Sequence, residues 1–290
     1  MAKLNKRAKY NRISVFDVVL SLIMIAFMAC IVLPFVHIIA VSLSDNLYVA
    51  NNLVSFWPKG FTLHTYITML SKGDFVRAYG VTIFVTVVGT VLSLTVTAMC
   101  AYALSRRAIV GHKFFSLMIT FTMFFSGGLI PGYLNINNLG MVDTIWALII
   151  PATINTWNMI IMRSFFIAYP SEIVESGQID GLQEAGVFFR LVLPTSKAAL
   201  ATIGLYYAVA YWNSYMPAKM YLPTNQELRP VQYLLQTMVS QIDPDQLEGG
   251  LVEASVRNAA IIIVITPIMC VYPFIQKYFV KGVMVGSVKG

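Results

Sequence analysis

The chain has 290 residues, of which 58% are hydrophobic and only 11% are charged, and its mean hydropathy is +0.72. This little polar surface cannot cover a soluble globular protein of this size. The composition therefore excludes an ordinary soluble protein and predicts a polytopic membrane protein. The formal net charge of +7 reflects an excess of Lys and Arg in the segments expected on the inner side of the membrane, and we expect no nucleic-acid partner.

A basic segment, residues 1–14, precedes the first apolar block. Basic residues followed by an apolar core are also typical of a secretion signal, and the sequence around Cys30 is similar to a lipoprotein cleavage site. The apolar run continues well beyond Cys30, which favours an uncleaved anchor.

The apolar residues fall into six blocks, each close to the length of helix that crosses about 30 Å of hydrocarbon. Uncharged runs of this length are too long for barrel strands, and their backbone must hydrogen-bond internally. The sequence therefore predicts an all-α membrane protein with a transmembrane domain over residues 15–279. The predicted spans are residues 15–41, 81–104, 114–133, 144–162, 198–216 and 258–276.

Lys and Arg bias the loops that carry them toward the cytoplasm. With the amino terminus inside, most of the 20 Lys and Arg residues fall in inner segments. We therefore expect both chain ends in the cytoplasm, with residues 280–290 as a cytoplasmic tail.

A long outer loop, residues 217–257, contains an acidic cluster of Asp243, Asp245 and Glu248 and an apolar strip at helical spacing that begins at Val231. Two interpretations stay open. The loop packs on the outer surface of this protein, or it inserts into a soluble protein that delivers a ligand.

The one substantial inner loop, residues 165–197, carries charge between two apolar spans. Ser171 is predicted to cap a first short helix. Asp180-Gly181 is predicted to end it, because glycine adopts backbone angles that other residues avoid. A second helix leads to Pro194, so we predict a rigid elbow.

Glu172 and Glu175 are three residues apart and share one face of the first helix. Ser176 and Gly177 beside them are too small to shield that face from a partner, and carboxylates can pair with an arginine. A hairpin lying on the membrane surface is the alternative, but such hairpins usually present basic faces to anionic lipid. The pattern favours a docking element.

This loop resembles the cytoplasmic signature of the inner-membrane permeases of ATP-binding-cassette importers. That signature reads Glu-Ala-Ala, three residues, Gly, nine residues, Ile-x-Leu-Pro. The departures are Ser176 and Gly177 for the two alanines and Leu191 for the isoleucine. The matching residues are Glu175, Gly181, Leu193 and Pro194, with Asp180 before the glycine as in sugar permeases.

Further similarities cover nearly the whole chain. Tyr211-Trp212-Asn213 with Pro217 resembles the Trp-Asn stretch of the maltose-type subunit, and Phe61-Thr-Leu63 resembles its first outer loop. The Glu-Ser-Gly variant and the tail are most similar to the subgroup that handles complex oligosaccharides such as alginate or aldouronate fragments.

The resemblance implies a type I importer permease fold in the bacterial cytoplasmic membrane. It implies a second permease subunit in a heterodimer, two cytoplasmic ATPase subunits that bind ATP and Mg, and a solute-binding protein that meets the outer loop. The sequence alone does not distinguish this pair from a homodimer. The residues expected to couple to the ATPase are Glu172, Glu175, Ser176, Gly177, Asp180, Gly181 and Pro194.

The chain has no Gly-x-x-x-x-Gly-Lys-Ser/Thr sequence, the loop that cradles nucleotide phosphates. We therefore expect that it binds no cofactor and is not itself an enzyme. The three cysteines show no spacing typical of metal ligands.

A sugar passage needs hydrogen-bonding groups and flat aromatic faces within apolar helices. Tyr and Trp also belong at membrane interfaces, and Asn often joins helix to helix, so a structural role is the alternative for each candidate. The candidates are Asn155, Trp157, Asn158, Tyr207, Tyr211, Trp212 and Asn213.

Other functions stay open on the sequence alone. An ion-coupled secondary carrier is disfavoured because no carboxylate lies in the middle of a span. An importer permease for a solute other than sugar is a second alternative. A membrane enzyme is disfavoured because no nucleophile, acid and base are brought together.

Overall fold

The computed structural model describes residues 15–71, 73–106, 109–240 and 252–287, with the backbone alone at residue 272 and residues 274–287. The basic segment 1–14, the acidic cluster Asp243, Asp245 and Glu248, and residues 288–290 lie outside the described residues. The described part contains helices and no strand, which confirms the all-α prediction. It forms two compact units.

The first unit comprises residues 1–69 and 242–263. Its long helix α1 (Val15–Ser42) buries only its last three residues, Ala40 to Ser42. A small core joins Ala40 and Val41 to Val49 of α2 (Asn46–Ala50), and the Tyr66 hydroxyl donates to Ser42 Oγ at 2.7 Å. The exposed apolar length of α1 is expected of a helix covered by lipid.

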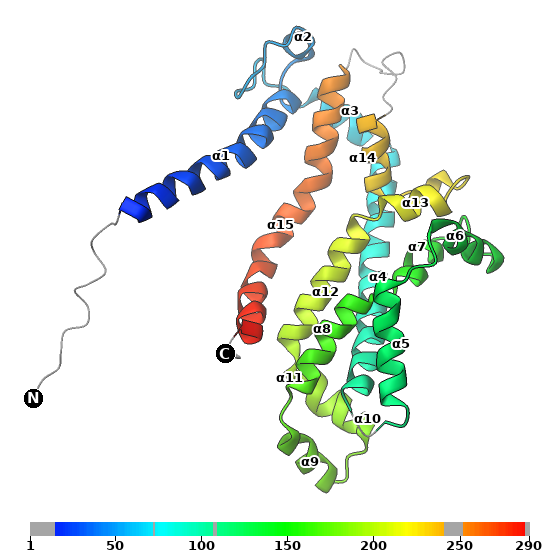
Figure 1. Ribbon diagram of the computed structural model, residues 1–290. Coiled ribbons are helices and arrows are strands. Elements are labelled where there is room, and N and C mark those ends of the chain that lie inside the picture. Colours follow the sequence, from blue (N-terminus) through cyan, green and yellow to red (C-terminus); the bar gives the residue numbers. More distant parts are fainter. Residues whose placement is uncertain (1–14, 72, 107–108, 241–251, 288–290) are drawn as a thin grey trace, which may run out of the picture. The chain divides into compact units, whose positions relative to one another are not determined.

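The second unit comprises residues 70–241 and 264–290 and holds most of the core. Its central helix is α4 (Gly73–Ser105), which packs against α12 (Lys197–Trp212) and α8 (Thr156–Ile167). Beside this bundle lies α5 (His112–Phe124), with no buried residue (Figure 1). The remaining helices of this unit outside the 165–197 loop are α6 (Leu129–Asn138), α7 (Trp146–Ile149), α13 (Tyr215–Tyr221) and α14 (Val231–Ser240). Two helices, α3 (His64–Ser71) and α15 (Glu253–Ser287), have residues in both units.

Among the described residues, three helices are long and apolar enough to cross a bilayer: α1, α4 and the Glu253–Val271 part of α15. The number rises to five if each of two bent helix pairs is one span. Six spans were predicted, and that number stays a prediction. Within the third, fourth and fifth of them the structure interrupts the helix.

Each interruption has a local cause. The third predicted span breaks between α5 and α6, which meet at 116°, where Gly128 adopts φ +89° and Pro131 follows. The fourth breaks after the 3₁₀ turn Ile150–Ala152, and Asn155 caps a new helix. The fifth ends at Trp212, because Pro217 has no N–H and its ring would clash with the carbonyl four residues earlier.

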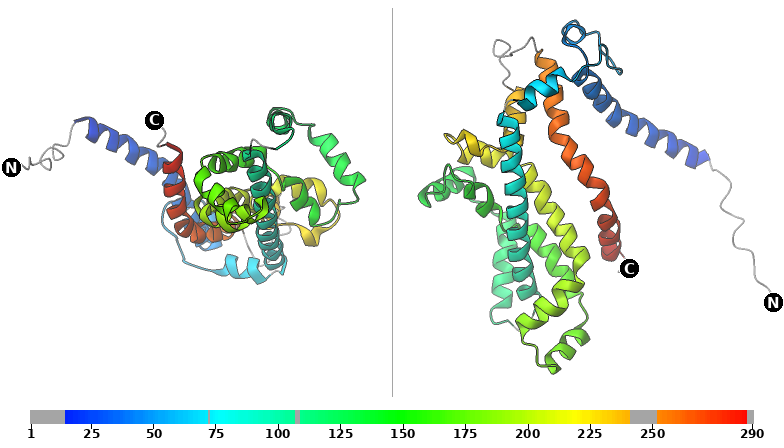
Figure 2. Two further views of the ribbon diagram at one scale, coloured as in Figure 1. Left: turned by 90° about the horizontal axis from the view of Figure 1, so that it is seen from below. Right: turned by 180° about the vertical axis from the view of Figure 1, so that it is seen from behind.

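The predicted outer loop packs in part on its own chain. Helix α14 lies against α4, where the backbone N–H of Val231 donates to Thr82 Oγ1 at 2.8 Å and Val231 is fully buried. Within the second unit, helices α9 and α10 of the 165–197 loop lie at one end of the α4, α8 and α12 bundle, and α6 and α13 lie at the other (Figures 1 and 2).

Candidate functional site

The loop 165–197, which the sequence leads us to expect to couple to an ATPase and which is called the coupling loop from here on, forms two helical arms joined at Gly181. Helix α9 (Ser171–Ile179) begins directly after Pro170, so Ser171 is the first helical residue and the predicted cap is wrong by one position. The helix ends at Ile179, with Asp180 as its C-cap and Gly181 next at φ +84°. The N–H of Gly181 donates to Gln178 O and that of Leu182 to Gly177 O, the paired bonds of a Schellman motif.

The second arm is one bent helical segment rather than a single regular helix. It runs through α10 (Glu184–Val187), a π-helical turn (Phe188–Val192) and α11 (Leu193–Thr195). Pro194 lies inside its last turn, where it has no N–H to donate, and the helix before it widens into the π turn. This arm and α12 meet at 82°.

Gly177 is buried at the contact between the two arms. An ideal Cβ on Gly177 would lie 2.6 Å from Leu191 Cδ1 and 3.8 Å from Val187 Cγ2. The close approach that glycine permits is therefore made within this chain, by the second arm of the same loop. Ser176, the neighbouring departure, is exposed.

The acidic face of α9 is open. Glu172, Glu175 and Asp180 are exposed, and within the described ranges no ion pair involves any of them. Glu172 and Glu175 follow each other by one helical turn, so their carboxylates lie on one face. Ile179, at the tip of the elbow, is 86% exposed. The loop thus presents carboxylates and an apolar tip at the end of the bundle.

Glu184 was not singled out by the sequence, yet both of its carboxylate oxygens are used. Oε1 accepts from Gln178 Nε2 at 2.9 Å, which joins the second arm to α9. Oε2 accepts from the Tyr102 hydroxyl at 3.0 Å, which joins the loop to the end of α4. The only sequence signal was an acidic residue in the first turn of a helix.

An aromatic cluster lies beneath this contact. The rings of Tyr102 and Phe188 have centroids 4.8 Å apart, and Phe166 of α8 packs edge-on against both at 6.1 and 6.3 Å. Phe188 and Phe166 are buried. The cluster seats the π turn of the coupling loop on α4 and α8.

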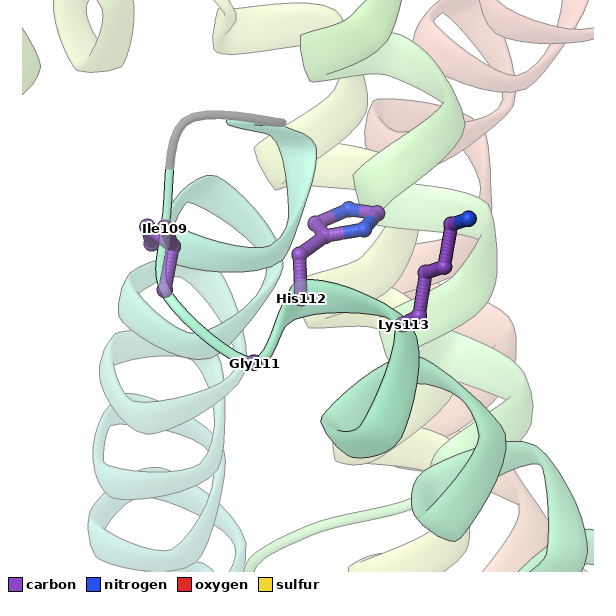
Figure 3. A pocket seen from close by; sticks show the side chains of 4 residues that line it. All are labelled: Ile109, Gly111, His112 and Lys113. Atoms are coloured by element: carbon purple, nitrogen blue, oxygen red, sulfur yellow. The ribbon is translucent and has the colours of Figure 1, made fainter.

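Basic side chains at the same end of the bundle contact the last turn of α4. Arg163 Nε donates to Leu104 O at 2.9 Å, and His112 Nε2 lies 3.0 Å from the same carbonyl oxygen, so both cap the last turn of α4. A pocket of about 580 Å³ is lined by Ile109, Gly111, His112 and Lys113. The side chains of His112 and Lys113 extend from the start of α5 (Figure 3).

Two of the candidate passage residues lie inside the bundle. Tyr207 and Tyr211 of α12 are 2% and 3% exposed. The Tyr207 hydroxyl lies 2.7 Å from Thr97 Oγ1 and accepts from the N–H of Asn155 at 2.9 Å. The Tyr211 hydroxyl donates to Ile149 O at 3.0 Å and lies 2.8 Å from Ser93 Oγ. Their hydroxyls form a polar seam that joins α12 to α4 and to the start of α8.

The candidates on α8 divide between surface and interior. Asn155 caps the helix, since its Oδ1 accepts from the N–H of Asn158 at 3.0 Å. Asn155 is exposed, Asn158 is buried, and Trp157 is 57% exposed. Of these three residues, only Asn155 and Trp157 have side chains exposed at the surface of the chain.

The candidates at the end of α12 contact neighbouring helices. The ring of Trp212 lies 6.4 Å from that of Tyr79, and its buried Nε1 has no hydrogen-bond partner among the described residues. Asn213 is exposed, and its Oδ1 accepts from Gln232 Nε2 of α14 at 3.1 Å.

At the opposite end of the unit, Asp143 joins two loops. Its carboxylate accepts from the backbone N–H groups of Thr224 and Asn225 at 3.0 and 2.8 Å and from the Thr224 hydroxyl at 2.7 Å. These hydrogen bonds, that from the Asn225 backbone first, hold the pKa of Asp143 below its usual value. The residue adopts φ +60°, which Asp tolerates better than most residues.

Comparison with known proteins agrees with the resemblance noted in the sequence. The family model described as "Binding-protein-dependent transport system inner membrane component" matches residues 96–285, which include the coupling loop and every candidate passage residue.

Two relatives come from Bacillus subtilis (strain 168). The Polygalacturonan/rhamnogalacturonan transport system permease protein YtcP is 41% identical over 282 residues, covering 95% of this chain and 98% of that one. Protein LplC is also 41% identical over 282 residues, with 95% of each chain covered.

A solved structure is similar over the whole fold. It is described as a bacterial ABC transporter involved in the import of the acidic polysaccharide alginate. The TM-score is 0.87 at 31% identity, and the match covers 96% of this chain and 100% of that one.

Proposed function

Because this chain belongs to the family of binding-protein-dependent transport system inner membrane components, we propose that it passes oligosaccharides across the bacterial cytoplasmic membrane for an ATP-driven importer. The family consists of the membrane-embedded permease subunits of such importers, and its members are multi-pass membrane proteins rather than ATPases. In this proposal the chain crosses the membrane six times, with both ends and the coupling loop in the cytoplasm.

The observation that carries the proposal is the coupling loop itself. A helical elbow fixed by a Schellman motif presents Glu172 and Glu175 on an open face at one end of the helix bundle. A partner that grips this face can move the attached helices as a body, because the second arm continues directly into α12.

The proposed partners follow from the family. Two cytoplasmic ATPase subunits, which hold ATP and Mg, grip the coupling loop, and Glu175 pairs with an arginine of the ATPase. A second permease completes the passage, and a solute-binding protein delivers the sugar at the outer side. Closure of the ATPase pair then closes the passage inside and opens it outside. By linkage, a loaded binding protein favours closure of the ATPases.

The proposed substrates are oligosaccharides of uronic acids, such as alginate or aldouronate fragments. The names of the relatives point this way, since polygalacturonan and alginate are both polymers of uronic acids. Of the candidate passage residues, Asn155, Trp157 and Asn213 expose side chains that a sugar can reach. Tyr207 and Tyr211 contribute by holding the helices that carry them.

Purification of the tagged chain tests the proposal. We expect an ATPase subunit and a second permease in the eluate, and in proteoliposomes we expect ATP-dependent uptake of a uronic-acid oligosaccharide with the cognate binding protein. The neutral sugar maltotriose is the control for substrate class. A chain that purifies alone and transports under a proton gradient without ATP would overturn the proposal in favour of a secondary carrier.

A further inference from the structure

The contact between the coupling loop and α4 joins segments that are distant in sequence. Tyr102 of α4 and Glu184 of the loop are 82 residues apart and hydrogen-bond directly. The Tyr102 hydroxyl also accepts from Arg106 Nη2 at 2.9 Å, and the Arg106 guanidinium lies over the Tyr102 ring at 4.9 Å from its centroid. One hydroxyl therefore connects the arginine at the end of α4 to the carboxylate of the loop.

The arrangement is poorly suited to a purely stabilising role. The side chain of Glu184 is 61% exposed and that of Arg106 is 28% exposed, and exposed ion pairs contribute little to stability. Burial of Phe188 and Phe166 already seats the loop by apolar packing. The polar contact instead fixes the orientation of the elbow relative to α4. One carboxylate oxygen of Glu184 accepts a hydrogen bond from α9, and the other accepts one from α4.

One hydrogen-bond donor at this contact, Arg106 Nε, lacks a partner among the described residues. This nitrogen is buried, and it lies 3.9 Å from Glu184 Oε2. An unsatisfied buried donor is energetically unfavourable. A small shift of the loop toward α4 would be stabilised by a direct charged hydrogen bond from Arg106 Nε to Glu184 Oε2.

We propose that Tyr102, Arg106 and Glu184 form a latch that transmits displacement of the coupling loop to α4. The loop is covalently continuous with α8 at one end and with α12 at the other, so α4 is coupled to it only through side-chain contacts. Glu184 is thus a positioning residue: it acts through Tyr102 and does not touch ATP or sugar. The inference rests on the proposed importer function.

The test is the number of sugars imported per ATP hydrolysed by the whole importer in proteoliposomes. Tyr102→Phe keeps the ring in its aromatic cluster and removes only the hydroxyl. We expect Tyr102→Phe and Glu184→Ala to lower the ratio roughly two- to fivefold, the range that a partly exposed polar contact supports, while ATP hydrolysis continues. The matched control is Asp74→Asn, which removes an exposed acid from a pair with Arg77 at the other end of α4.

A charge exchange distinguishes a latch from a general structural effect. In the double variant Arg106→Glu/Glu184→Arg, the Tyr102 hydroxyl donates to the new glutamate and accepts from the new arginine. We expect this variant to recover most of the lost ratio, whereas each single exchange does not. A normal ratio in Tyr102→Phe and Glu184→Ala would overturn the latch.

The two proposals fail differently. If the chain is not an importer permease, the unsubstituted protein shows no ATP-dependent uptake at all. If only the latch is wrong, the unsubstituted importer works and the variants match it.

Discussion

The Leu191 side chain occupies the space that a methyl group on Gly177 would need, since an ideal Cβ there would lie 2.6 Å from Leu191 Cδ1. Both residues depart from the family signature, which has alanine and isoleucine at these positions. Leucine branches at Cγ and carries two δ carbons, whereas isoleucine branches at Cβ and carries one, so the Leu191 δ-methyl at this contact and the missing methyl group of Gly177 compensate each other. The two departures therefore form one packing unit between the arms of the elbow.

A double-variant cycle tests this compensation. Gly177→Ala gains helix propensity of up to about 1 kcal/mol but overpacks the contact by about 1 to 3 kcal/mol, so we expect a lower melting temperature of the purified importer. In Gly177→Ala/Leu191→Ile the overlap is relieved, and the same alanine becomes neutral or stabilising. Equal effects of Gly177→Ala in both backgrounds would show that the two residues do not interact.

Substitution of Gly181 should act through the backbone. Nothing lies within 4 Å of an added Cβ, but the residue adopts φ +84°, which is unfavourable by about 1 to 2 kcal/mol for ordinary residues. We expect Gly181→Val to insert normally yet reduce uptake per ATP, and Gly181→Asp to uncouple in the same direction but less strongly. Gly181→Asn is the control, because asparagine tolerates this conformation. Transport at the normal ratio in the valine variant would contradict the rigid elbow.

Loss of the Glu175 charge should weaken the grip of the ATPase. Glu175 is exposed and pairs with no cation among the described residues, so its charge is available to a partner. We expect Glu175→Gln to reduce the amount of ATPase subunit retained during purification. The difference in retained ATPase between the variant and the unsubstituted protein should narrow at high salt, because screening weakens the charge pair in the unsubstituted protein. Glu227→Gln removes another exposed acid, from the outer loop, and should retain the ATPase fully.

Acid should loosen the contact of Asp143 with the loop at Thr224. The folded state lowers the pKa of Asp143 from its ordinary value of 3.8, so this carboxylate stabilises the fold above that pH and loses its contribution as the pH falls through the lower folded-state pKa. Asp143→Asn keeps the backbone conformation and removes the charge. We expect a lower melting temperature than that of the unsubstituted protein at neutral pH, and a difference that shrinks in acid. A constant difference across the pH range would exclude the charge as its cause.

Removal of the Tyr211 hydroxyl separates a packing role from a sugar-binding role. Tyr211→Phe loses buried hydrogen bonds to Ser93 and Ile149, worth about 0.5 to 1.5 kcal/mol each, so we expect a lower melting temperature with an unchanged KM for uptake. Trp157→Ala, on an exposed face, should raise the KM at an unchanged melting temperature. Tyr48→Phe, at an exposed tyrosine of the first unit, is the control. A raised KM in Tyr211→Phe would assign that hydroxyl to the passage.

The sequence was sufficient for features that depend on neighbours along the chain. The bounds of α1, the acidic face of α9 and the turn at Gly181 all follow from local composition and backbone preference. Breaks within apolar runs were missed, because the runs stay apolar overall through the breaks after which Gly128 and Asn155 cap new helices.

Contacts between distant segments could not be predicted. The residues near Glu184 in the sequence do not indicate its hydrogen bond with Tyr102. The small size of Gly177 is equally consistent with close packing against a partner protein and with close packing against Leu191. Each of these pairings is decided by how the helices pack, which a single sequence does not reveal.

The bend of 82° between the second arm of the coupling loop and α12 determines which kind of movement the loop can impart. A push directed along the arm is almost wholly transverse to the axis of α12. Such a push would therefore tilt the helix about its contacts and would not slide it along its own axis. Lengthwise sliding would break the hydroxyl pairs Ser93 with Tyr211 and Thr97 with Tyr207 together, whereas tilting can use one such pair as a pivot.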